Sequence, residues 1–416
     1  MRIAVWHNLP SGGGKRALFY HVRGLLERGH NVESWCPPSA DQEFLPLNDI
    51  TREHVVALEP VQSQVQGGMR GRLRKWRQRA MAFERMVRHC RLCAAEISLG
   101  HFDVLFANSC RFNGVAPIGR CLQIPKVLYL QEPYRTLYEA MPGLPWRAPT
   151  SVQRAWTPHN AMTLIKDLIK VQALRAQARE EWSSARAFDV ILVNSFFSRE
   201  SILRVYGLEA RVCYLGVDTE KFRPSNVQKE QIVVGLGNID SNKRVSRAIR
   251  ALATIEKSRR PVLVWIGNYT LAAYEASVRA LATSLGVTFV PKVAVSDNEL
   301  IDLLSRASVM LYTPRLEPFG LAVLEANACG TGVVAIAEGG VRESVVDGVN
   351  GFLVPNGEPE ELGRAVLQFL ESPEFSRRIG QTARRHVEKN WSLVAAVERL
   401  EMELFRAAQN GAKTND

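Results

Sequence analysis

Short runs of apolar and β-branched residues alternate along the chain with segments whose apolar positions recur every three or four residues. The short runs predict strands, and the segments between them have the length and period of helices. This alternation is typical of βαβ units, in which right-handed crossovers join parallel strands. Strands are expected at residues 2–8, 31–36, 102–108, 126–132, 188–195 and 211–217, and again at 231–238, 261–268, 287–293, 308–314, 332–338 and 351–355.

The polar stretch 218–231, with Pro224 inside it, separates the two series of strands. A chain of 416 residues is long for one hydrophobic core, so two domains are the natural expectation. We predict an α/β protein with two Rossmann-like doubly wound parallel-sheet domains, residues 1–218 and 219–390. A C-terminal helix at 391–416 is expected to return to the first domain. Ligands bind beyond the carboxyl ends of such strands, so two facing domains predict a substrate in the cleft between them.

The overall composition is that of an ordinary globular protein, with 46% hydrophobic and 23% charged residues. The sequence contains no run of 18 or more apolar residues, so we expect no membrane-spanning helix. The first apolar stretch is too short for a signal peptide, and the seven cysteines are scattered, so we expect a cytoplasmic protein. Cys90 and Cys93 form a CxxC pair that nothing completes, and we expect no metal.

The stretch "RLEPFGLAVLEANACGTG", residues 315–332, carries the first candidate site. A strand ends before it, a Pro-Phe-Gly turn follows, and a helix begins whose first backbone amides can bind a phosphate. Glu317 precedes this helix, and Glu325 lies roughly 8 Å further along the helix axis. One carboxylate would then lie beside the phosphate's substituent, and the other would reach a second group such as a ribose diol. The alternative is that Glu317 caps the helix and Glu325 faces solvent.

This stretch resembles the E-x7-E motif of retaining glycosyltransferases with the GT-B fold, family 4 (glycosyl transferases group 1). Further segments follow in the family's order: "SGGG", "NSFFSRESILRVYG", "YLGVDTEKFRP" and "EGGVRESVVDGVNGFLV". The similarity is dense from Phe188 to Val354 and thinner before it. The resemblance implies that Glu317 contacts the transferred sugar and that Glu325 binds the ribose. The amides at Phe319, Gly320 and Leu321 would hold the diphosphate.

The loop "GLGNIDSNKR", residues 235–244, is the second candidate site. Family members usually carry an Arg after the glycine and a Lys five residues on, both contacting the donor diphosphate. Here Asn238, directly after Gly237, stands in place of the Arg, and Lys243, five residues further on, stands at the Lys position. Arg244, where a glycine is usual, is a candidate for the missing charge. A Lys at this place offsets the negative charge that develops on the leaving phosphates, and the alternative is a solvated basic loop.

The first domain offers two further segments. Gly13 and Gly14 follow the first strand in a loop that matches neither a Walker A nor a G-x-G-x-x-G pattern, and the resemblance places them at the donor phosphate. Gln131 stands where relatives often have a His that touches the sugar or acceptor; it can hydrogen-bond but cannot act as a base. Glu132 and Arg135 are candidates for acceptor contact or for a structural role.

Basic residues are concentrated in one segment. The chain has 53 basic and 42 acidic residues, a net charge of +11, and residues 67–92 hold nine Lys or Arg against one Glu. The apolar positions there recur at helical spacing, namely Leu73, Trp76, Ala80, Phe83, Val87, Cys90, Ala94 and Ile97. The candidate membrane-docking residues on the remaining surface are Arg72, Arg74, Lys75, Arg77 and Arg79.

Three interpretations of this basic helix stay open. The helix can pack on the first domain with its basic face exposed to solvent. It can also lie on anionic lipid, which attracts each nearby basic residue by about 1 kcal/mol. Nucleic acid is disfavoured, because no recognisable binding module accompanies the stripe. Many family 4 enzymes glycosylate lipid-linked acceptors at a membrane, so the resemblance favours lipid and a peripheral position on the inner face of the cell membrane.

The sequence thus predicts a retaining hexosyltransferase that uses a nucleotide-diphospho-sugar donor and no further cofactor. Its acceptor would be a hydroxyl of a glycan or lipid-linked glycan in polysaccharide or lipopolysaccharide-type biosynthesis. The resemblance implies attack and departure on one face of the sugar without a metal, with the leaving phosphate oxygen taking the acceptor's proton. The alternative is a non-catalytic GT-B partner subunit that binds nucleotide sugars, which Asn238 and Gln131 suggest. A dinucleotide-dependent oxidoreductase is disfavoured because no G-x-G-x-x-G follows the first strand.

Overall fold

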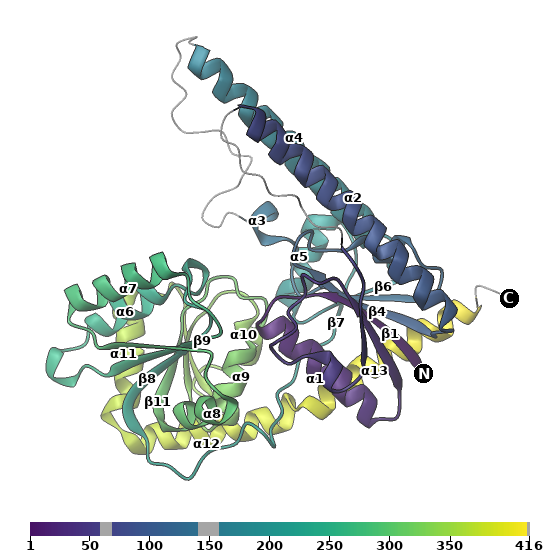
Figure 1. The fold of residues 1–416 in the computed structure, drawn as a ribbon. Helices are drawn as coiled ribbons and strands as arrows, with labels where there is room; N and C mark the ends of the chain where they lie inside the picture. Colours follow the sequence, from purple (N-terminus) through teal and green to yellow (C-terminus); the bar gives the residue numbers. More distant parts are fainter. Residues whose placement is uncertain (59–68, 140–157, 414–416) are drawn as a thin grey trace. The chain divides into compact units, whose positions relative to one another are not determined.

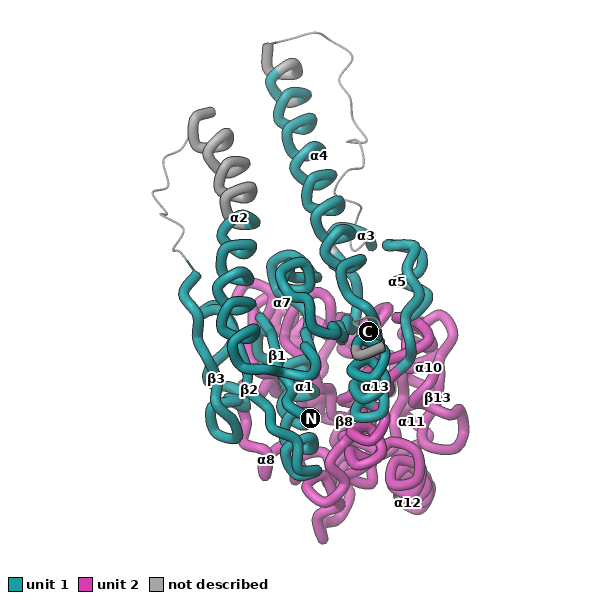
Figure 2. The backbone as a smooth tube through the Cα atoms, turned by 90° about the vertical axis from the view of Figure 1, so that its right-hand side faces the viewer, with its two compact units in different colours: residues 1–193, 199–212, 400–416 teal, residues 194–198, 213–399 magenta. Residues whose placement is uncertain are grey.

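The computed structural model describes residues 1–58, 69–139 and 158–413. Side chains at residues 69–82, 136, 158–161, 163 and 412–413 lie outside the description. The chain forms two compact units (Figure 2). Unit 1 comprises residues 1–193, 199–212 and 400–416, and unit 2 comprises residues 194–198 and 213–399. After a short excursion at residues 194–198, the chain enters unit 2 at Cys213 and returns to unit 1 after Arg399. The boundaries expected at residues 218 and 390 stay predictions.

Unit 1 is built on seven parallel strands in the order β3-β2-β1-β4-β5-β6-β7. The strands are β1 (Arg2–Asn8), β2 (Asn31–Cys36), β3 (Arg52–Val55), β4 (Val104–Cys110), β5 (Lys126–Tyr129), β6 (Val190–Val193) and β7 (Arg211–Val212). Its helices are α1 (Gly13–Glu27), α2 (Met69–Leu99), α3 (Arg135–Tyr138) and α4 (Pro158–Ala185), with short 3-10 turns η1 (Leu47–Asp49) and η2 (Pro117–Arg120). Two helices, α5 (Phe196–Tyr206) and α13 (Leu393–Lys413), carry residues of both units.

Unit 2 is built on six parallel strands in the order β10-β9-β8-β11-β12-β13, with helices on both faces of the sheet (Figure 1). The strands are β8 (Glu230–Leu236), β9 (Val262–Gly267), β10 (Phe289–Val293), β11 (Ala307–Tyr312), β12 (Val333–Ile336) and β13 (Gly351–Val354). The helices are α6 (Val245–Ala253), α7 (Ala272–Leu285), α8 (Asp297–Arg306), α9 (Leu321–Ala328), α10 (Val341–Ser344), α11 (Pro359–Glu371) and α12 (Pro373–Asn390), with η3 (Ser241–Lys243) and η4 (Lys257–Arg259).

The two predicted parallel-sheet domains are confirmed, and each of the twelve predicted strands is present. The prediction omitted β3, because "REHV" has a single apolar residue and its burial is only partial. In both sheets the strand order reverses, between β1 and β4 in unit 1 and between β8 and β11 in unit 2. Loops that leave adjacent strands in opposite directions open a crevice at such a switch point. In unit 2 these are the loops at residues 237–244 and 313–320, which carry Lys243 and Glu317.

The C-terminal half of α2 packs on the sheet of unit 1 as its helical period predicts. Cys90, Ala94 and Ile97 are buried in the core, together with Met86 and Cys93. The helix also contacts α4 and η2 (Figure 1). The predicted apolar positions at residues 73, 76 and 80 lie outside the described side chains. No helix within the described ranges combines the length and the apolar character needed to cross a bilayer.

A carboxyl group is buried inside unit 1, on α4. Glu181 is 1% exposed, and its Oε1 accepts a hydrogen bond of 2.6 Å from the Tyr206 hydroxyl. A Cβ at Gly114 would lie 2.1 Å from the same oxygen, so only glycine fits there. Burial is the main cause that raises the pKa of Glu181 to about 8, from an ordinary value of 4.5. The group therefore holds its proton at neutral pH.

We predict that this carboxyl group makes unit 1 less stable as the pH rises from about 5 to 8. In that window the unfolded chain has lost the Glu181 proton and the folded chain retains it, so the free energy of unfolding falls with pH, on the order of a few kcal/mol in total. Glu181→Gln keeps the acceptor oxygen and removes the titration. Its unfolding midpoint, followed by circular dichroism, should depend less on pH than that of the wild type.

The neighbouring exposed carboxylate supplies a control for this comparison. Glu180 forms a surface ion pair with Arg120, and Glu180→Gln should leave the wild-type slope in place. Equal slopes for the wild type and Glu181→Gln would show that Glu181 is ionised in the folded protein.

Candidate functional site

The two residues predicted to be catalytic meet in unit 2. Lys243 Nζ donates a hydrogen bond to Glu317 Oε2 over 2.8 Å. The Lys243 side chain is 24% exposed and the Glu317 side chain is 18% exposed, so the pair is partly shielded from water. The two residues are 74 positions apart in sequence and lie on the two loops that flank the switch point between β8 and β11.

The loop after β8 is shaped so that Lys243 points toward Glu317. Gly237 has a φ of 146°, and a Cβ at this position would lie 3.1 Å from the Cγ and Cδ atoms of Lys243. The glycine therefore leaves room for the lysine's aliphatic chain. Asp240 Oδ1 accepts hydrogen bonds from the amides of Asn242 and Lys243, and the Thr313 hydroxyl donates to the Lys243 carbonyl oxygen over 3.0 Å. The lysine backbone is thus fixed from both loops.

The loop that carries Glu317 is held by backbone contacts. The Gly340 amide donates to the Glu317 carbonyl oxygen over 2.8 Å, and the Ser195 hydroxyl donates to the Pro318 carbonyl oxygen over 2.5 Å. A Cβ at Gly339 would lie 2.4 Å from the Glu317 carbonyl oxygen, and one at Gly340 would lie 2.0 Å from that of Pro318. The glycine pair of the "EGG" segment is therefore required because two backbones touch.

Aromatic side chains pack around Phe319 and hold the same loop in place. Phe319 is 2% exposed, and its ring centroid lies 5.5 Å from that of Trp391 and 6.3 Å from that of Tyr214. The Tyr214 hydroxyl donates to Glu343 over 2.9 Å, and burial raises the pKa of Tyr214. Glu343 also accepts from the backbone amides of residues 196 and 197, at the start of α5. The sequence offers no separate signal for these supporting contacts, although Tyr214, Phe319 and Glu343 lie within the segments quoted above and only Trp391 lies outside them.

Helix α9 begins where the sequence predicts it. Gly320 has a φ of 90° and forms the N-terminal cap, and Leu321 is the first helical residue. Within the described part of the chain, no hydrogen bond uses the backbone amides of Phe319, Gly320 or Leu321. Unused amides at a helix N-terminus, close to a lysine, form a site suited to an anion.

Glu325 is buried inside α9, at 5% exposure. The alternative in which this carboxylate faces solvent is therefore wrong. A buried carboxylate at the second turn of the helix is expensive to keep unless it serves packing or binds a polar partner. The predicted contact with a ribose stays a prediction.

The two unusual residues of the loop after β8 have separate roles. Asn238 Oδ1 accepts hydrogen bonds from the amides of Asn268 and Tyr269, at 3.2 and 3.4 Å, so this oxygen holds the turn after β9. Arg244 adopts a left-handed backbone conformation with a φ of 53°, the conformation that a glycine accepts most easily. Burial is the main cause that lowers the pKa of Arg244, with the charge of Arg247 adding to it.

In unit 1 Gly13 and Gly14 are the first two residues of α1 and not part of the loop that was expected, and the structure brings Gly14 close to Gln131. A Cβ at Gly14 would lie 3.2 Å from Gln131 Nε2, whereas a Cβ at Gly13 would meet nothing within 4 Å. Arg135 is paired with two carboxylates, Glu139 at 2.6 Å and Glu132 at 3.4 Å. Glu132 and Arg135 therefore interact with each other, and their contact with an acceptor stays a prediction. The side chains of Arg72, Arg74, Lys75, Arg77 and Arg79 lie outside the described residues.

Two family profiles match the chain. The profile of the family described as "Glycosyl transferases group 1" matches residues 217–386, and that of "Glycosyltransferase Family 4" matches residues 11–221. The chain belongs to glycosyltransferase family 4. Both Lys243 and Glu317 fall in the first matched region, and the two glycines of α1 and Gln131 fall in the second.

Several curated relatives of this family 4 chain are D-inositol 3-phosphate glycosyltransferases. That of Streptomyces avermitilis is 30% identical over 232 residues, covering 50% of this chain and 50% of the relative. That of Kribbella flavida is 32% identical over 232 residues, covering 50% of this chain and 55% of the relative. The chain thus spans about half the length of the curated relatives it matches.

Solved structures resemble the chain over nearly its whole length. Anabaena Alr3699/HepE in complex with UDP has a TM-score of 0.69 at 19% identity, covering 98% of this chain and 100% of that one. Sucrose-phosphate synthase from Thermosynechococcus elongatus gives the same TM-score of 0.69 and the same 19% identity, with 98% and 100% coverage. At these identities the likeness shows the fold, and the fold is GT-B.

Proposed function

We propose that this family 4 chain is a retaining glycosyltransferase that moves a sugar from a nucleotide-diphospho-sugar to a hydroxyl of a glycan or lipid-linked glycan. The observation that carries the proposal is the contact of Lys243 with Glu317, beside the unused amides at the start of α9. A cation and several aligned amides suit a diphosphate, and a carboxylate next to them suits a sugar that gains positive charge.

Lys243 can act on both groups at once. An ammonium has three donors, and one of them is used by Glu317. The ammonium can also contact a phosphate oxygen and stabilise the negative charge that develops there as the glycosidic bond breaks. Lysine and amides together supply the positive charge that a metal ion would otherwise bring, so we propose a metal-independent transfer.

Glu317 lies on the sugar side of this arrangement. Its carboxylate would stabilise the oxocarbenium-like sugar in the transition state. The acceptor hydroxyl would attack from the face that the diphosphate leaves, and the departing phosphate oxygen would take the hydroxyl proton. Gln131 is no base in this scheme, since an amide binds a hydroxyl without accepting its proton at neutral pH. The configuration at the anomeric carbon is then retained.

Two similarities support the substrate classes. Anabaena Alr3699/HepE has been crystallised with UDP, and also with UDP and glucose, which supports a nucleotide-sugar donor here. A lipopolysaccharide outer core galactosyltransferase, WaaB, shares the fold with a TM-score of 0.61 at 14% identity, covering 98% of this chain and 99% of that one. We propose an acceptor in polysaccharide or lipopolysaccharide-type biosynthesis and a hexosyl group as the sugar transferred.

The competing proposal is a non-catalytic GT-B partner subunit. It draws on Asn238, whose side-chain oxygen serves the backbone, and on Gln131, which replaces a histidine. The intact pair of Lys243 and Glu317 favours the enzyme, because a subunit without chemistry has no need of a half-buried lysine and carboxylate beside an anion site.

Glu317→Gln should abolish sugar transfer while the fold is kept. The amide is isosteric but lacks the charge that stabilises the transition state, so we expect a loss of about 100-fold or more in the release of nucleoside diphosphate from donor sugars. A matched control is Glu299→Gln, which removes a carboxylate from another lysine pair of unit 2, Lys292–Glu299 at 2.9 Å. Near-normal turnover in Glu317→Gln would exclude the catalytic role, and no donor hydrolysis by the wild type would favour the partner subunit.

Glu325→Gln should weaken nucleotide binding more than it slows the chemical step. Thermal-shift measurements with UDP, GDP and ADP first identify the nucleotide that stabilises the wild type, since a ligand at 100 times its Kd adds about 2.7 kcal/mol of stability. The shift with that nucleotide should shrink in the variant. An unchanged shift, with unchanged KM for the donor, would remove Glu325 from the donor site.

We further propose that the enzyme works at the inner face of the cell membrane, docked through the basic part of α2. The helix against which α2 packs, α4, exposes Leu164, Ile165 and Leu168 at about half of their surface. Basic residues and exposed apolar residues on two neighbouring helices fit an anionic lipid surface.

Replacing the five docking residues 72, 74, 75, 77 and 79 with glutamine should abolish sedimentation with anionic vesicles at low salt. Each basic residue contributes about 1 kcal/mol near such a surface, so five together decide whether the protein binds. A charge-matched control replaces exposed basic residues of unit 2, namely Arg250, Lys257, Arg364, Arg385 and Lys389. A wild type that stays in the supernatant at low salt would refute the docking.

A further inference from the structure

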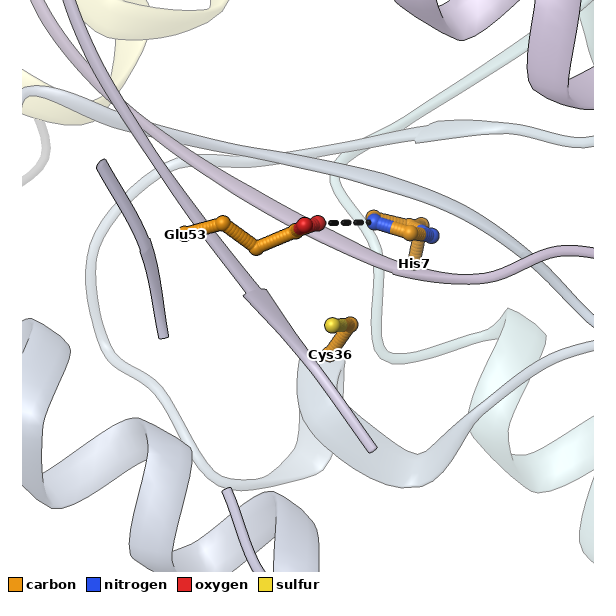
Figure 3. A group of neighbouring side chains, drawn as sticks. All are labelled: His7, Cys36 and Glu53. Atoms are coloured by element: carbon orange, nitrogen blue, oxygen red, sulfur yellow. Dashed lines mark hydrogen bonds and ion pairs between the residues drawn. The ribbon is translucent and has the colours of Figure 1, made fainter. Parts of the chain in front are cut away.

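Unit 1 contains a buried cluster of side chains that the transfer reaction does not use. His7 on β1, Cys36 at the end of β2 and Glu53 on β3 converge inside the unit (Figure 3). Each offers one potential ligand atom, and these atoms all lie within 4.8 Å of one another. His7 and Cys36 are 0% exposed, and the Glu53 side chain is 1% exposed. Among the described residues this is the one set of three that could hold a metal ion.

The register of the sheet explains why these side chains share one face. Trp6 of β1 lies opposite Trp35 of β2, so the next residues of the two strands, His7 and Cys36, are also neighbours. Ser34 of β2 lies opposite Glu53 of β3. Side chains alternate between the two faces of a strand, which places positions 7, 34, 36 and 53 on the same side. The arrangement therefore follows from the strand pairing.

Hydrogen bonds within the protein satisfy this cluster only in part. His7 Nε2 is bonded to Glu53 Oε1 at 2.9 Å, and His7 Nδ1 is buried without a hydrogen-bond partner. Glu53 interacts with the Cys36 thiol, and this thiol accepts a hydrogen bond of 3.4 Å from Gln42 Nε2. Lys15 Nζ, from the first turn of α1, is also buried and unpartnered, and its charge acts on His7 and Glu53. Buried polar atoms without partners cost free energy, and a native protein rarely keeps two of them, here His7 Nδ1 and Lys15 Nζ, in one cluster.

We propose that His7, Cys36 and Glu53 bind a zinc ion inside unit 1. One thiolate, one imidazole and one carboxylate form a donor set that suits Zn²⁺ and that Mg²⁺ or Ca²⁺ would not choose. The three residues belong to unit 1, whereas Lys243 and Glu317 belong to unit 2.

The distances in the cluster fit this ion. Zinc binds sulfur at about 2.3 Å and nitrogen or oxygen at about 2.0 Å, so two ligands of a tetrahedral site lie roughly 3.5 Å apart. Ligand atoms that already lie within 4.8 Å need side-chain adjustments of roughly 1 Å to reach that geometry. The hydrogen bond between the imidazole and the carboxylate would be replaced by two bonds to the ion. Burial raises the pKa of Cys36 to about 12, so zinc binding releases the thiol proton.

Lys15 decides what fills the fourth position. Thiolate and carboxylate neutralise the charge of Zn²⁺, which leaves Asp41 as the remaining negative charge that acts on Lys15. A zinc-bound hydroxide would accept a hydrogen bond from Lys15 Nζ and add to the negative charge beside it. The unpartnered ammonium thus acquires an acceptor when the ion is present. The zinc would link β1, β2 and β3, including the strand that has the weakest apolar pattern.

The test uses the full chain without an affinity tag, stripped of metal with a chelator. Titration with Co²⁺ should give a near-ultraviolet thiolate-to-cobalt charge-transfer band that saturates at one equivalent, and Zn²⁺ should displace the cobalt. X-ray absorption of the zinc-loaded wild type should show one sulfur at about 2.3 Å and two or three nitrogen or oxygen atoms at about 2.0 Å.

Variants separate this site from binding elsewhere. Cys36→Ser should lose the charge-transfer band and weaken zinc binding by about 100-fold or more, and Glu53→Gln should weaken it by at least about 10-fold. The matched control is Cys110→Ser, a buried cysteine at the end of β4 in the same unit, and it should keep both the band and the affinity.

The proposal fails if the wild type shows no charge-transfer band, or if the absorption spectrum contains only nitrogen and oxygen neighbours. It also fails if the band persists in Cys36→Ser or disappears equally in Cys110→Ser. The absorption measurement needs no variant, so misfolding of Cys36→Ser would leave the proposal testable.

Discussion

The candidate site depends on one ion pair, between Lys243 and Glu317. The pair joins two loops that come from adjacent strands but are 74 residues apart in sequence. Its side chains are about one-fifth exposed, so water screens their attraction less than it would at an open surface. This contact sets where the ammonium lies relative to the first amides of α9. An anion bound by those amides therefore meets a cation whose position the protein has already fixed, and little reorganisation is needed when charge develops.

Close backbone contact is what makes this ion pair possible. Gly237 allows the lysine chain to pass over the strand end, and Gly339 and Gly340 let the "EGG" segment touch the backbone at Glu317 and Pro318. In each case a Cβ would occupy the space that a functional atom or its support needs. The glycines of the family segments are thus explained by two backbones in contact, and Phe319 adds a buried anchor between Tyr214 and Trp391. The same glycines therefore keep the two loops rigid and leave space for a phosphate to approach them.

Sequence patterns predicted the strands of unit 2, and the loops that carry Lys243 and Glu317, because both have local signals. Alternating strands and helices determine a doubly wound sheet, and the switch point then brings the loops of Lys243 and Glu317 together. The role of Asn238 had no such signal, because its side-chain oxygen bonds to amides 30 and 31 residues away. The cluster of His7, Cys36 and Glu53 was missed for a related reason. Glu53 lies on β3, which has almost no apolar pattern, and a ligand set cannot be assembled from sequence when one of its strands is not predicted.

The loss of the usual arginine changes how a diphosphate would be neutralised. Position 238 holds an amide that serves the turn after β9, so positive charge must come from elsewhere in unit 2. Arg244 is the nearest arginine along the chain, and it adopts a left-handed backbone conformation that is uncommon for a residue with a Cβ. Its pKa is lowered first by burial and then by Arg247, and Arg315 acts in the same direction. Arg247 and Arg315 are each paired with a carboxylate, Glu358 at 3.4 Å and Glu338 at 3.1 Å. Arg244 has no such ion pair among the described residues, so it is the guanidinium group that we propose for the diphosphate in place of the arginine that relatives carry at position 238.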